Sequence, residues 1–178
     1  MAGIDETRDF LPLRIAVMAV SDTRTLETDK SGALLAERLQ EAGHILAERV
    51  VLRDDVLQIR TRAEAWIADP KIDVILTTGG TGLTGRDVTP EALRPLFEKE
   101  IDGFAAVFHQ ISYQTVATST MASRACAGVA RGTLIFCVPG SSGGCRDAWD
   151  GILKYQLDSR HRPCNLVDLI PRLEEHRR

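Results

Sequence analysis

Short apolar runs alternate with amphipathic stretches along most of this chain. Four runs rich in Val, Ile and Leu predict strands, and the first is almost continuously apolar, as in strands buried on both faces: residues 14–20, 45–52, 72–76 and 133–138. Apolar residues at helical spacing predict helices at residues 29–42, 56–67, 90–97, 101–114 and 145–153. This alternation predicts an α/β fold, a three-layer sandwich in which a mostly parallel sheet is covered by helices on both faces.

Capping residues and helix breakers support these boundaries. Asp29 is a candidate N-cap of the first helix, and Thr89 is a candidate N-cap of the helix that begins at Pro90. Pro95 is expected to kink or shorten that helix. A run of small residues at 118–127 predicts one further helix.

Phosphate-binding features are concentrated in one loop, between the strand at residues 72–76 and the helix at Pro90. Its sequence is Thr77-Thr-Gly-Gly-Thr-Gly-Leu-Thr-Gly-Arg-Asp87. The glycines carry no side chain, so backbone N–H groups approach an anion closely, and Thr78 and Thr81 add hydroxyl donors. These features favour phosphate binding over the alternative, a glycine-rich turn without a ligand.

Two nucleotide-binding fingerprints nearly match this loop. Gly80-Thr-Gly-Leu-Thr-Gly85 has the G-x-G-x-x-G pattern, but a dinucleotide site needs its helix to begin at the last glycine. Gly80 and Gly85 also have P-loop spacing, but Arg86-Asp87 stands where Lys and then Ser or Thr are needed. A carboxylate beside a phosphate site is a natural Mg²⁺ ligand, so Asp87 is a candidate metal ligand.

Polar residues also follow the other predicted strands at their carboxyl ends, namely Ser21 and Asp22, Asp54 and Asp55, and Gly140 and Ser141. In open α/β sheets ligands bind at this edge, and right-handed crossovers bring these residues to the glycine loop. Each position has an alternative. Ser21 and Asp22 can simply turn the chain, and Asp54, Asp55 or Ser141 can cap the helix that follows.

Composition and charge narrow the class of protein. The 178 residues fit a single domain, residues 1–178, with residues 1–12 as a flexible arm, and the fractions of 44% hydrophobic and 26% charged residues are near the globular average. A net charge of -3 gives no electrostatic basis for binding nucleic acid or an anionic membrane. The polar N-terminus lacks a signal sequence, and no apolar run approaches the roughly 20 residues that span a bilayer. We therefore expect a cytoplasmic protein.

Cysteine and histidine spacing gives no metal site. Cys126, Cys137, Cys145 and Cys164 form neither a C-x-x-C pair nor a zinc-like pattern with histidine. The four histidines are scattered, without an H-x-x-x-H pair. In a chain without an export signal, most of the cysteines are expected to be reduced core residues.

The glycine loop and its continuation, Thr77 to Ala92, resemble the signature of the MoaB/MogA family of molybdenum cofactor biosynthesis proteins, related to domains of gephyrin. The resemblance spans nearly the whole chain. Supporting motifs are Val20-Ser-Asp22, Asp29-Lys-Ser-Gly32, Arg53-Asp-Asp55 and Pro139-Gly-Ser141. The segments Thr118-Ser-Thr120 with Ser123-Arg-Ala125, and Arg162-Pro-Cys-Asn165, are more similar to the shorter MoaB branch.

This resemblance implies a molybdopterin adenylyltransferase, which joins the terminal phosphate of molybdopterin to the AMP part of ATP and releases pyrophosphate. Carried over by position, Asp54 and Asp87 are the implied catalytic carboxylates and Mg²⁺ ligands. The implied substrate and phosphate-binding residues are Ser21, Asp22, Thr78, Gly79, Gly80, Thr81, Gly82, Arg86, Gly140 and Ser141. The resemblance further implies a homo-oligomer, a trimer or a hexamer.

The chain departs from the family pattern in two places. Gly103-Phe-Ala-Ala106 stands where the family usually has Gly-Phe-Gly-Glu, and Gly143 stands where the family often has lysine. Two functions therefore stay open: an ATP-dependent adenylyltransferase, and a non-catalytic binder of molybdopterin or nucleotide in the same pathway. A dinucleotide oxidoreductase is a more distant alternative, which selective NAD binding would support.

Overall fold

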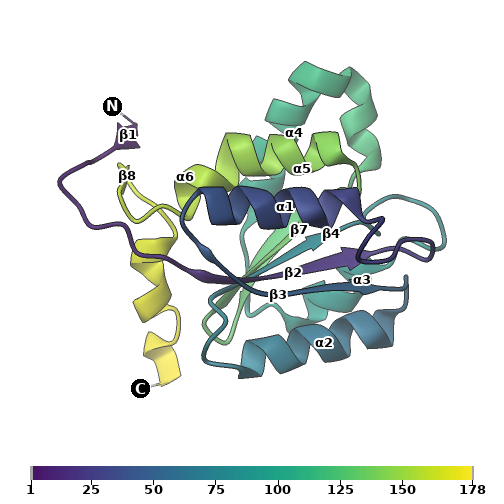
Figure 1. The fold of residues 1–178 in the computed structure, drawn as a ribbon, viewed down its shortest axis with the longest axis horizontal. Helices are drawn as coiled ribbons and strands as arrows, with labels where there is room; N and C mark the ends of the chain where they lie inside the picture. Colours follow the sequence, from purple (N-terminus) through teal and green to yellow (C-terminus); the bar gives the residue numbers. More distant parts are fainter. Residues whose placement is uncertain (1, 178) are drawn as a thin grey trace.

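The predicted sheet is present, together with two strands that the apolar pattern missed. The computed structural model describes residues 2–177, and its central sheet has the strand order β3-β2-β4-β7-β6-β5 (Figure 1). The strands are β2 (Arg14–Val20), β3 (Ile45–Leu52), β4 (Val74–Thr78), β5 (Lys99–Glu100), β6 (Cys126–Ala130) and β7 (Thr133–Val138). Strands β3, β2, β4 and β7 pair in parallel, whereas β6 and β5 are antiparallel. The prediction of a mostly parallel sheet is confirmed.

Helices cover both faces of this sheet, as predicted. One face carries α1 (Lys30–Glu41), α4 (Asp102–Val116) and α5 (Ser142–Ala148), and the other carries α2 (Val56–Ala68) and α3 (Thr89–Leu93) (Figure 1). Successive side chains of a strand point to opposite faces. In β2, Ile15 and Val17 therefore pack with the first group of helices, and Ala16 and Met18 pack with the second.

The remaining elements are short. They are β1 (Gly3–Ile4), η1 (Arg94–Leu96), η2 (Ala117–Ala122), the π-helix η3 (Trp149–Leu153), α6 (Lys154–Gln156), β8 (His161–Arg162), η4 (Val167–Arg172) and η5 (Glu175–Arg177). Pro95 shortens α3 as expected, because the α-helix ends at Leu93 and tightens into η1.

Helix capping resolves one alternative and corrects one prediction. The Asp29 carboxylate accepts a hydrogen bond from the Gly32 N–H, and the Asp55 carboxylate accepts one from the Gln58 N–H at 2.8 Å. Asp55 therefore caps α2, and the neighbouring Asp54 does not. The prediction that Thr89 is an N-cap is wrong, because α3 begins at Thr89 and its hydroxyl donates to the Gly79 carbonyl oxygen at 2.8 Å.

The helix predicted at residues 118–127 is also wrong. The segment forms the short helix η2, then an extended stretch, and then β6, which pairs with β7. The turn between these strands has positive φ at Arg131 and Gly132, the geometry of a tight hairpin. The small residues serve close packing, since a Cβ at Gly128 would lie 2.3 Å from the Phe97 ring. Tertiary contacts override the helical preference of alanine here.

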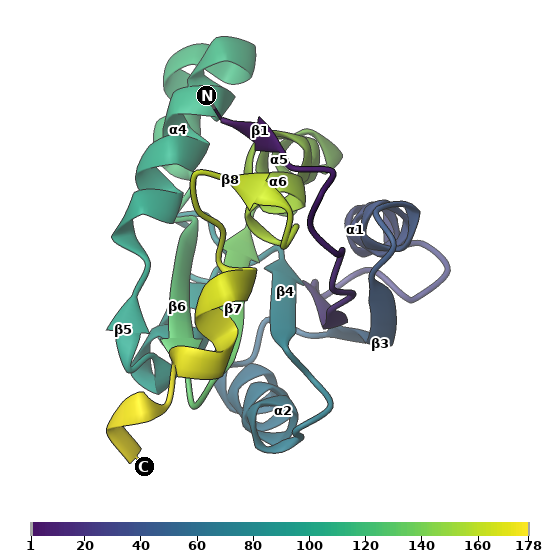
Figure 2. The same ribbon diagram turned by 90° about the vertical axis from the view of Figure 1, so that its left-hand side faces the viewer.

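The first residues are held by contacts with the end of the chain, whereas the sequence predicted a flexible arm at residues 1–12. Strand β1 pairs with β8, as Figure 2 shows at its upper centre. Arg8 forms an ion pair with Asp168 at 2.8 Å, and Phe10 lies against His44 with their ring centroids 5.1 Å apart. Residues of η4 and beyond, including Ile170, pack on the core. Met1 lies outside the described residues.

Two further findings bear on the class of protein. Within residues 2–177, no helix is both long and apolar enough to cross a membrane. All four cysteines are free thiols. Cys126, Cys137 and Cys145 are buried, in agreement with the prediction of reduced core residues, and Cys164 is exposed.

His44 is a buried base beneath the N-terminal segment. Its Nδ1 accepts a hydrogen bond from the Leu13 N–H at 3.2 Å, and its ring meets the edge of Trp149. Burial lowers the pKa of His44 from 6.5 to about 4, against the opposing effect of the Asp158 charge. Between these pH values the unfolded chain binds a proton that the folded chain does not bind. The free energy of unfolding should therefore fall as the pH is lowered from 6.5 to 4.

We predict that His44→Asn flattens this acid dependence. The asparagine oxygen can accept the Leu13 N–H, but the side chain does not titrate. Wild type should lose stability more steeply than the variant, by up to about 1.4 kcal/mol per pH unit, in urea unfolding measured between pH 7 and pH 4. His176→Asn, at an exposed position, is the matched control and should keep the wild-type slope. Equal slopes for wild type and His44→Asn would contradict the prediction.

Candidate functional site

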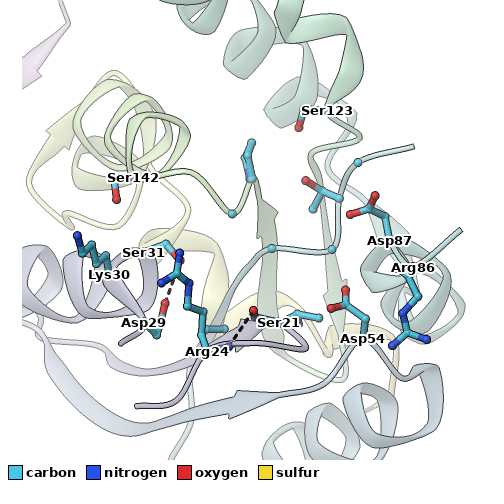
Figure 3. A pocket seen from close by; sticks show the side chains of 18 of the residues that line it. Ser21, Arg24, Asp29, Lys30, Ser31, Asp54, Arg86, Asp87, Ser123 and Ser142 are labelled. Carbon is cyan, nitrogen blue, oxygen red and sulfur yellow. Dashed lines mark hydrogen bonds between the residues drawn. The ribbon is translucent and has the colours of Figure 1, made fainter. Parts of the chain in front are cut away.

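A cleft of about 590 Å³ lies at the carboxyl edge of the parallel strands. It is lined by the glycine loop after β4, by Val20 at the end of β2 and Ser21 after it, by Asp54 after β3, and by Gly140 after β7. Figure 3 shows Asp54, Arg86 and Asp87 on one side of the loop, and Asp29, Lys30 and Ser31 on the other. The edge predicted from the strand ends is therefore the edge that holds the cleft.

The glycine loop has this shape because side chains do not fit in it. Gly79 and Gly80 have φ of +95° and +64°, which side-chain-bearing residues rarely adopt. A Cβ at Gly79 would lie 2.3 Å from the Val20 carbonyl oxygen. A Cβ at Gly140 would lie 3.1 Å from the Gly79 Cα. The ends of β2, β4 and β7 therefore meet through backbone atoms.

Four successive carbonyl groups of the loop are bound by two residues outside it. Thr89 donates to Gly79 through its hydroxyl and to Gly80 through its backbone N–H, at 2.8 and 3.0 Å. Arg124 donates to Thr81 through its backbone N–H and to Gly82 through Nε, both at 2.8 Å.

These bonds also set the direction of the N–H groups. In a trans peptide the N–H points opposite to the carbonyl, so the N–H groups that follow these carbonyls face away from Thr89 and Arg124. Within residues 2–177, the N–H groups of Gly80 and Thr81 have no protein acceptor. Unpaired N–H donors that line a cleft are suited to bind phosphate oxygens.

Asp87 is held as an anion at the end of the loop. Its Oδ2 accepts hydrogen bonds from the Thr84 N–H at 2.9 Å and from the Thr84 hydroxyl at 2.7 Å. These bonds lower the pKa of Asp87. A Cβ at Gly82 would lie 2.7 Å from the same Oδ2, so Gly82 leaves the room that this carboxylate occupies.

Asp54 lies against the other side of the loop, where a Cβ at Gly80 would be 3.0 Å from its Oδ1. Its pKa is raised, first by burial and then by the negative charges of Asp22 and Asp87. The charge of Arg86 opposes this effect. Asp54 is therefore a carboxylate whose negative charge is poorly compensated by the protein.

Asp22 and Arg86 form a pair at the rim of the cleft. Arg86 donates through Nε and Nη2 to the Asp22 carboxylate, with a shortest distance of 2.7 Å. This contact lowers the pKa of Asp22. Arg86 lines the cleft, but Asp22 does not. We predicted Asp22 as a site residue. In the structure it acts on the cleft indirectly, because its carboxylate holds the side chain of Arg86.

Besides Asp22, two other predicted site residues, Thr78 and Ser141, do not line the cleft. The Thr78 hydroxyl is buried and donates to the Pro139 carbonyl oxygen at 2.8 Å, so it ties β4 to the end of β7. The Ser141 hydroxyl accepts a hydrogen bond from the Gly144 N–H at 3.0 Å and caps α5. Each hydroxyl therefore has a role in the fold, and direct substrate contacts by these two residues stay a prediction.

The remaining walls of the cleft come from segments that were not predicted as site residues. They are Arg24, Asp29, Lys30 and Ser31 around the start of α1, Ser119, Ala122 and Ser123 around η2, and Ser142 at the start of α5. Two signals were available, because the motifs Asp29-Lys-Ser-Gly32 and Ser123-Arg-Ala125 both belong to the family resemblance. Their place at the site depends on tertiary contacts.

The donor set of the cleft fits Mg²⁺ bound together with a phosphate. Among residues 2–177 no group of three or more His, Cys, Asp or Glu side chains is close enough to form an all-protein metal site. Asp54 and Asp87, however, flank the loop with two carboxylates. Mg²⁺ is commonly bound by one or two carboxylates, with water and substrate phosphate oxygens as the other ligands.

Comparison with known proteins identifies the relatives of this chain. Residues 16–159 match the family model of a probable molybdopterin binding domain. Molybdenum cofactor biosynthesis protein B of Escherichia coli (strain K12) is 49% identical over 157 residues, which cover 88% of this chain and 92% of that protein.

Solved structures of molybdenum and tungsten cofactor biosynthesis proteins have a fold similar to that of this chain. A crystal structure of molybdenum cofactor biosynthesis protein B aligns with a TM-score of 0.83 at 39% identity, over 96% of this chain and 100% of that one. The tungsten cofactor synthesizing protein MoaB from Pyrococcus furiosus aligns with a TM-score of 0.71 at 29% identity, over 93% and 96% of the two chains.

The loop geometry generates a prediction about stability. Gly79→Ala should lower the free energy of unfolding by at least about 2 kcal/mol, because it combines an unfavourable φ with a contact to the Val20 carbonyl oxygen. Gly85→Ala is the matched control in the same loop. No atom lies within 4 Å of the position that a Cβ would take there, so the loss should stay below about 0.5 kcal/mol. Urea unfolding of both variants measures the difference, and similar losses would refute the explanation.

Proposed function

The chain belongs to the molybdopterin-binding family of molybdenum cofactor biosynthesis proteins, and we propose that within this pathway it is a molybdopterin adenylyltransferase. It would join the terminal phosphate of molybdopterin to the AMP part of ATP and release pyrophosphate. Molybdopterin and ATP are thus the proposed substrates, and Mg²⁺ is the proposed cofactor.

One observation carries this proposal: two carboxylates, Asp54 and Asp87, flank a loop whose N–H groups at Gly80 and Thr81 are unpaired in the part of the chain that the structure describes. A site for adenylyl transfer has to bind several phosphate groups next to one another. It also has to place a cation where negative charge develops. The cleft combines donors for phosphate oxygens with oxygen ligands for a cation within one loop.

The proposed reaction is a substitution at phosphorus. An oxygen of the molybdopterin phosphate forms a bond to the α-phosphorus of ATP, the bond from that phosphorus to the bridging oxygen breaks, and pyrophosphate leaves. Both reacting groups are anions, so the protein contributes by binding and orienting them. The N–H groups of the loop would bind phosphate oxygens, and Arg86 would add positive charge at the rim.

The two carboxylates would hold Mg²⁺, which when bound supplies positive charge opposite the phosphate oxygens. Asp87 is suited to this role because its hydrogen bonds with Thr84 fix its position and keep it ionised. Asp54 is suited because the protein compensates its charge poorly, so a nearby cation stabilises its ionised form.

Two departures from the family pattern bear on the alternative, a non-catalytic binder of molybdopterin or nucleotide, and the second one favours it. Ala106 is exposed on α4 and does not line the cleft, so a glutamate missing there leaves the carboxylates of the cleft unchanged. Gly143 lies at the start of α5, and nothing lies within 4 Å of the position of its Cβ. A lysine would fit at this position, so its absence removes a possible cation near the cleft.

We also propose that the protein is a homo-oligomer, a trimer or a hexamer. Large apolar side chains are exposed on α4 and η2, where Tyr113 is 53% and Met121 is 78% exposed. Exposed apolar side chains on these two consecutive helices are suited to contact another subunit.

We predict that wild-type protein releases pyrophosphate from ATP in the presence of Mg²⁺ and molybdopterin, and that Asp87→Asn lowers kcat by at least about 100-fold. The asparagine can still accept hydrogen bonds from Thr84, so the loop should fold normally. Asp102→Asn is the matched control, because Asp102 is exposed on α4 and does not line the cleft. It should retain wild-type turnover. If wild type binds molybdopterin but releases no pyrophosphate, the transferase proposal is wrong and the binder is favoured.

Gly143→Lys separates the two functions further. If the chain is already an active transferase, the added lysine should change kcat by less than about 3-fold. If wild type is silent and Gly143→Lys gains pyrophosphate release in the same assay, the missing lysine explains a non-catalytic wild type. Thermal unfolding should be close to wild type in both cases, since the position is open.

A further inference from the structure

Arg124 joins the segment after η2 to the glycine loop. It lies between η2 and β6 and does not itself line the cleft. Its backbone N–H and its guanidinium donate to three carbonyl groups of the loop, those of Thr81, Gly82 and Asp87, at 2.8, 2.8 and 3.0 Å. One residue thus binds both the start and the end of the segment that carries Asp87.

The guanidinium has a second partner, Glu91 on α3. Nη1 and Nη2 of Arg124 donate to the two oxygens of the Glu91 carboxylate, and this contact lowers the pKa of Glu91. The Arg124 side chain is only 30% exposed, whereas that of Glu91 is 51% exposed. Surface ion pairs contribute little to stability, typically about 0 to 1 kcal/mol. The ion pair alone is therefore a weak reason for an arginine at this position.

The two carbonyl contacts made by the guanidinium, to Gly82 and Asp87, require the shape of arginine, whereas the contact to Thr81 is made by the backbone N–H. A guanidinium presents five N–H donors in a fixed plane, so one side chain can bind Gly82, Asp87 and Glu91 in different directions. A lysine ammonium carries the same charge on a flexible stem and does not reproduce this arrangement. The consequence for the site concerns Asp87, because its backbone is fixed by Arg124 while its carboxylate is fixed by Thr84.

We propose that Arg124 is a positioning residue for adenylyl transfer, which orients the peptide groups of the glycine loop and the backbone of Asp87. This inference rests on the proposed function. Arg124 acts through the loop and touches no reacting atom. Its bond to the Thr81 carbonyl orients the peptide group that carries the Gly82 N–H, which helps to lower the pKa of Asp87. Its bond to the Asp87 carbonyl sets where the carboxylate stands relative to bound phosphate. A misplacement of about 1 Å at such a group is enough to cost roughly 100-fold in rate.

The experiment compares Arg124→Lys with Glu91→Gln. Arg124→Lys removes the guanidinium contacts to the Gly82 and Asp87 carbonyls but keeps a positive charge and the backbone bond to Thr81. Glu91→Gln removes the ion pair but leaves Arg124 free to bind the Gly82 and Asp87 carbonyls. We expect Arg124→Lys to lower kcat by roughly 10- to 100-fold, with the KM for molybdopterin changed less than about 3-fold. Glu91→Gln should lower kcat by less than about 3-fold. Circular dichroism and thermal unfolding verify that both variants are folded.

Equal losses of kcat in the two variants would show that the ion pair matters rather than the loop contacts, and would overturn the inference. Full activity of Arg124→Lys would overturn it as well. If Arg124→Lys does not fold, Arg124→Gln is measured in its place. If neither variant folds, the residue has a structural role and the inference is wrong.

A second measurement separates this inference from the proposed function. Calorimetric titration with ATP and Mg²⁺ reports the phosphate site whether or not the protein turns over. If wild type binds ATP but releases no pyrophosphate, the proposed transferase fails. The orienting role then predicts at least about 10-fold weaker ATP binding for Arg124→Lys and nearly unchanged binding for Glu91→Gln. If wild type shows neither turnover nor ATP binding, both the proposed function and this inference are overturned.

Discussion

The close approach of three strand ends is the constraint on which the rest of the site depends. The glycine loop passes so near Val20 and Gly140 that only backbone atoms fit between them. The proposed phosphate-binding role of the loop depends on this crowding, because peptide groups line the cleft where side chains cannot. The same crowding makes the loop dependent on neighbours for its orientation. Thr89 and Arg124 supply it by binding four successive carbonyl groups.

The three carboxylates around the loop, Asp22, Asp54 and Asp87, lie in different electrostatic environments. Asp22 is paired with Arg86 at the rim, and Asp87 is stabilised by hydrogen bonds from Thr84. The pKa of Asp54 is raised, because burial and the charges of Asp22 and Asp87 outweigh the charge of Arg86 and a backbone hydrogen bond with Asp22. A group of this kind gains most from a cation supplied with the substrate, because the protein leaves its charge uncompensated. In the proposed function, Asp54 and Asp87 would supply some of the ligands of a Mg²⁺ ion, and the phosphate oxygens of the nucleotide would supply others.

The sequence predicted the parallel strands well, because strands buried on both faces leave long apolar runs. It missed β6, because this strand is rich in small residues and is defined by its pairing with β7, with Gly128 packed against the Phe97 ring. At the site, the rule that ligands bind at strand ends located the cleft and the glycine loop. The rule did not show that the hydroxyls of Thr78 and Ser141 turn toward the protein. The contacts of Arg124 with the loop could not be predicted, because its partners lie about 40 residues earlier and share no local sequence pattern with it.

The pairing of β1 with β8 has a consequence for the order of folding. The contact between Arg8 and Asp168 joins residues separated by 160 positions. If it formed first, closing a loop of that length would cost roughly 4 to 5 kcal/mol of chain entropy, far more than a two-residue ladder returns. The two ends must therefore meet after the central sheet has brought them together. The pairing of β1 with β8 therefore forms late in folding. A spectroscopic probe placed on these strands would report the completion of folding rather than its beginning.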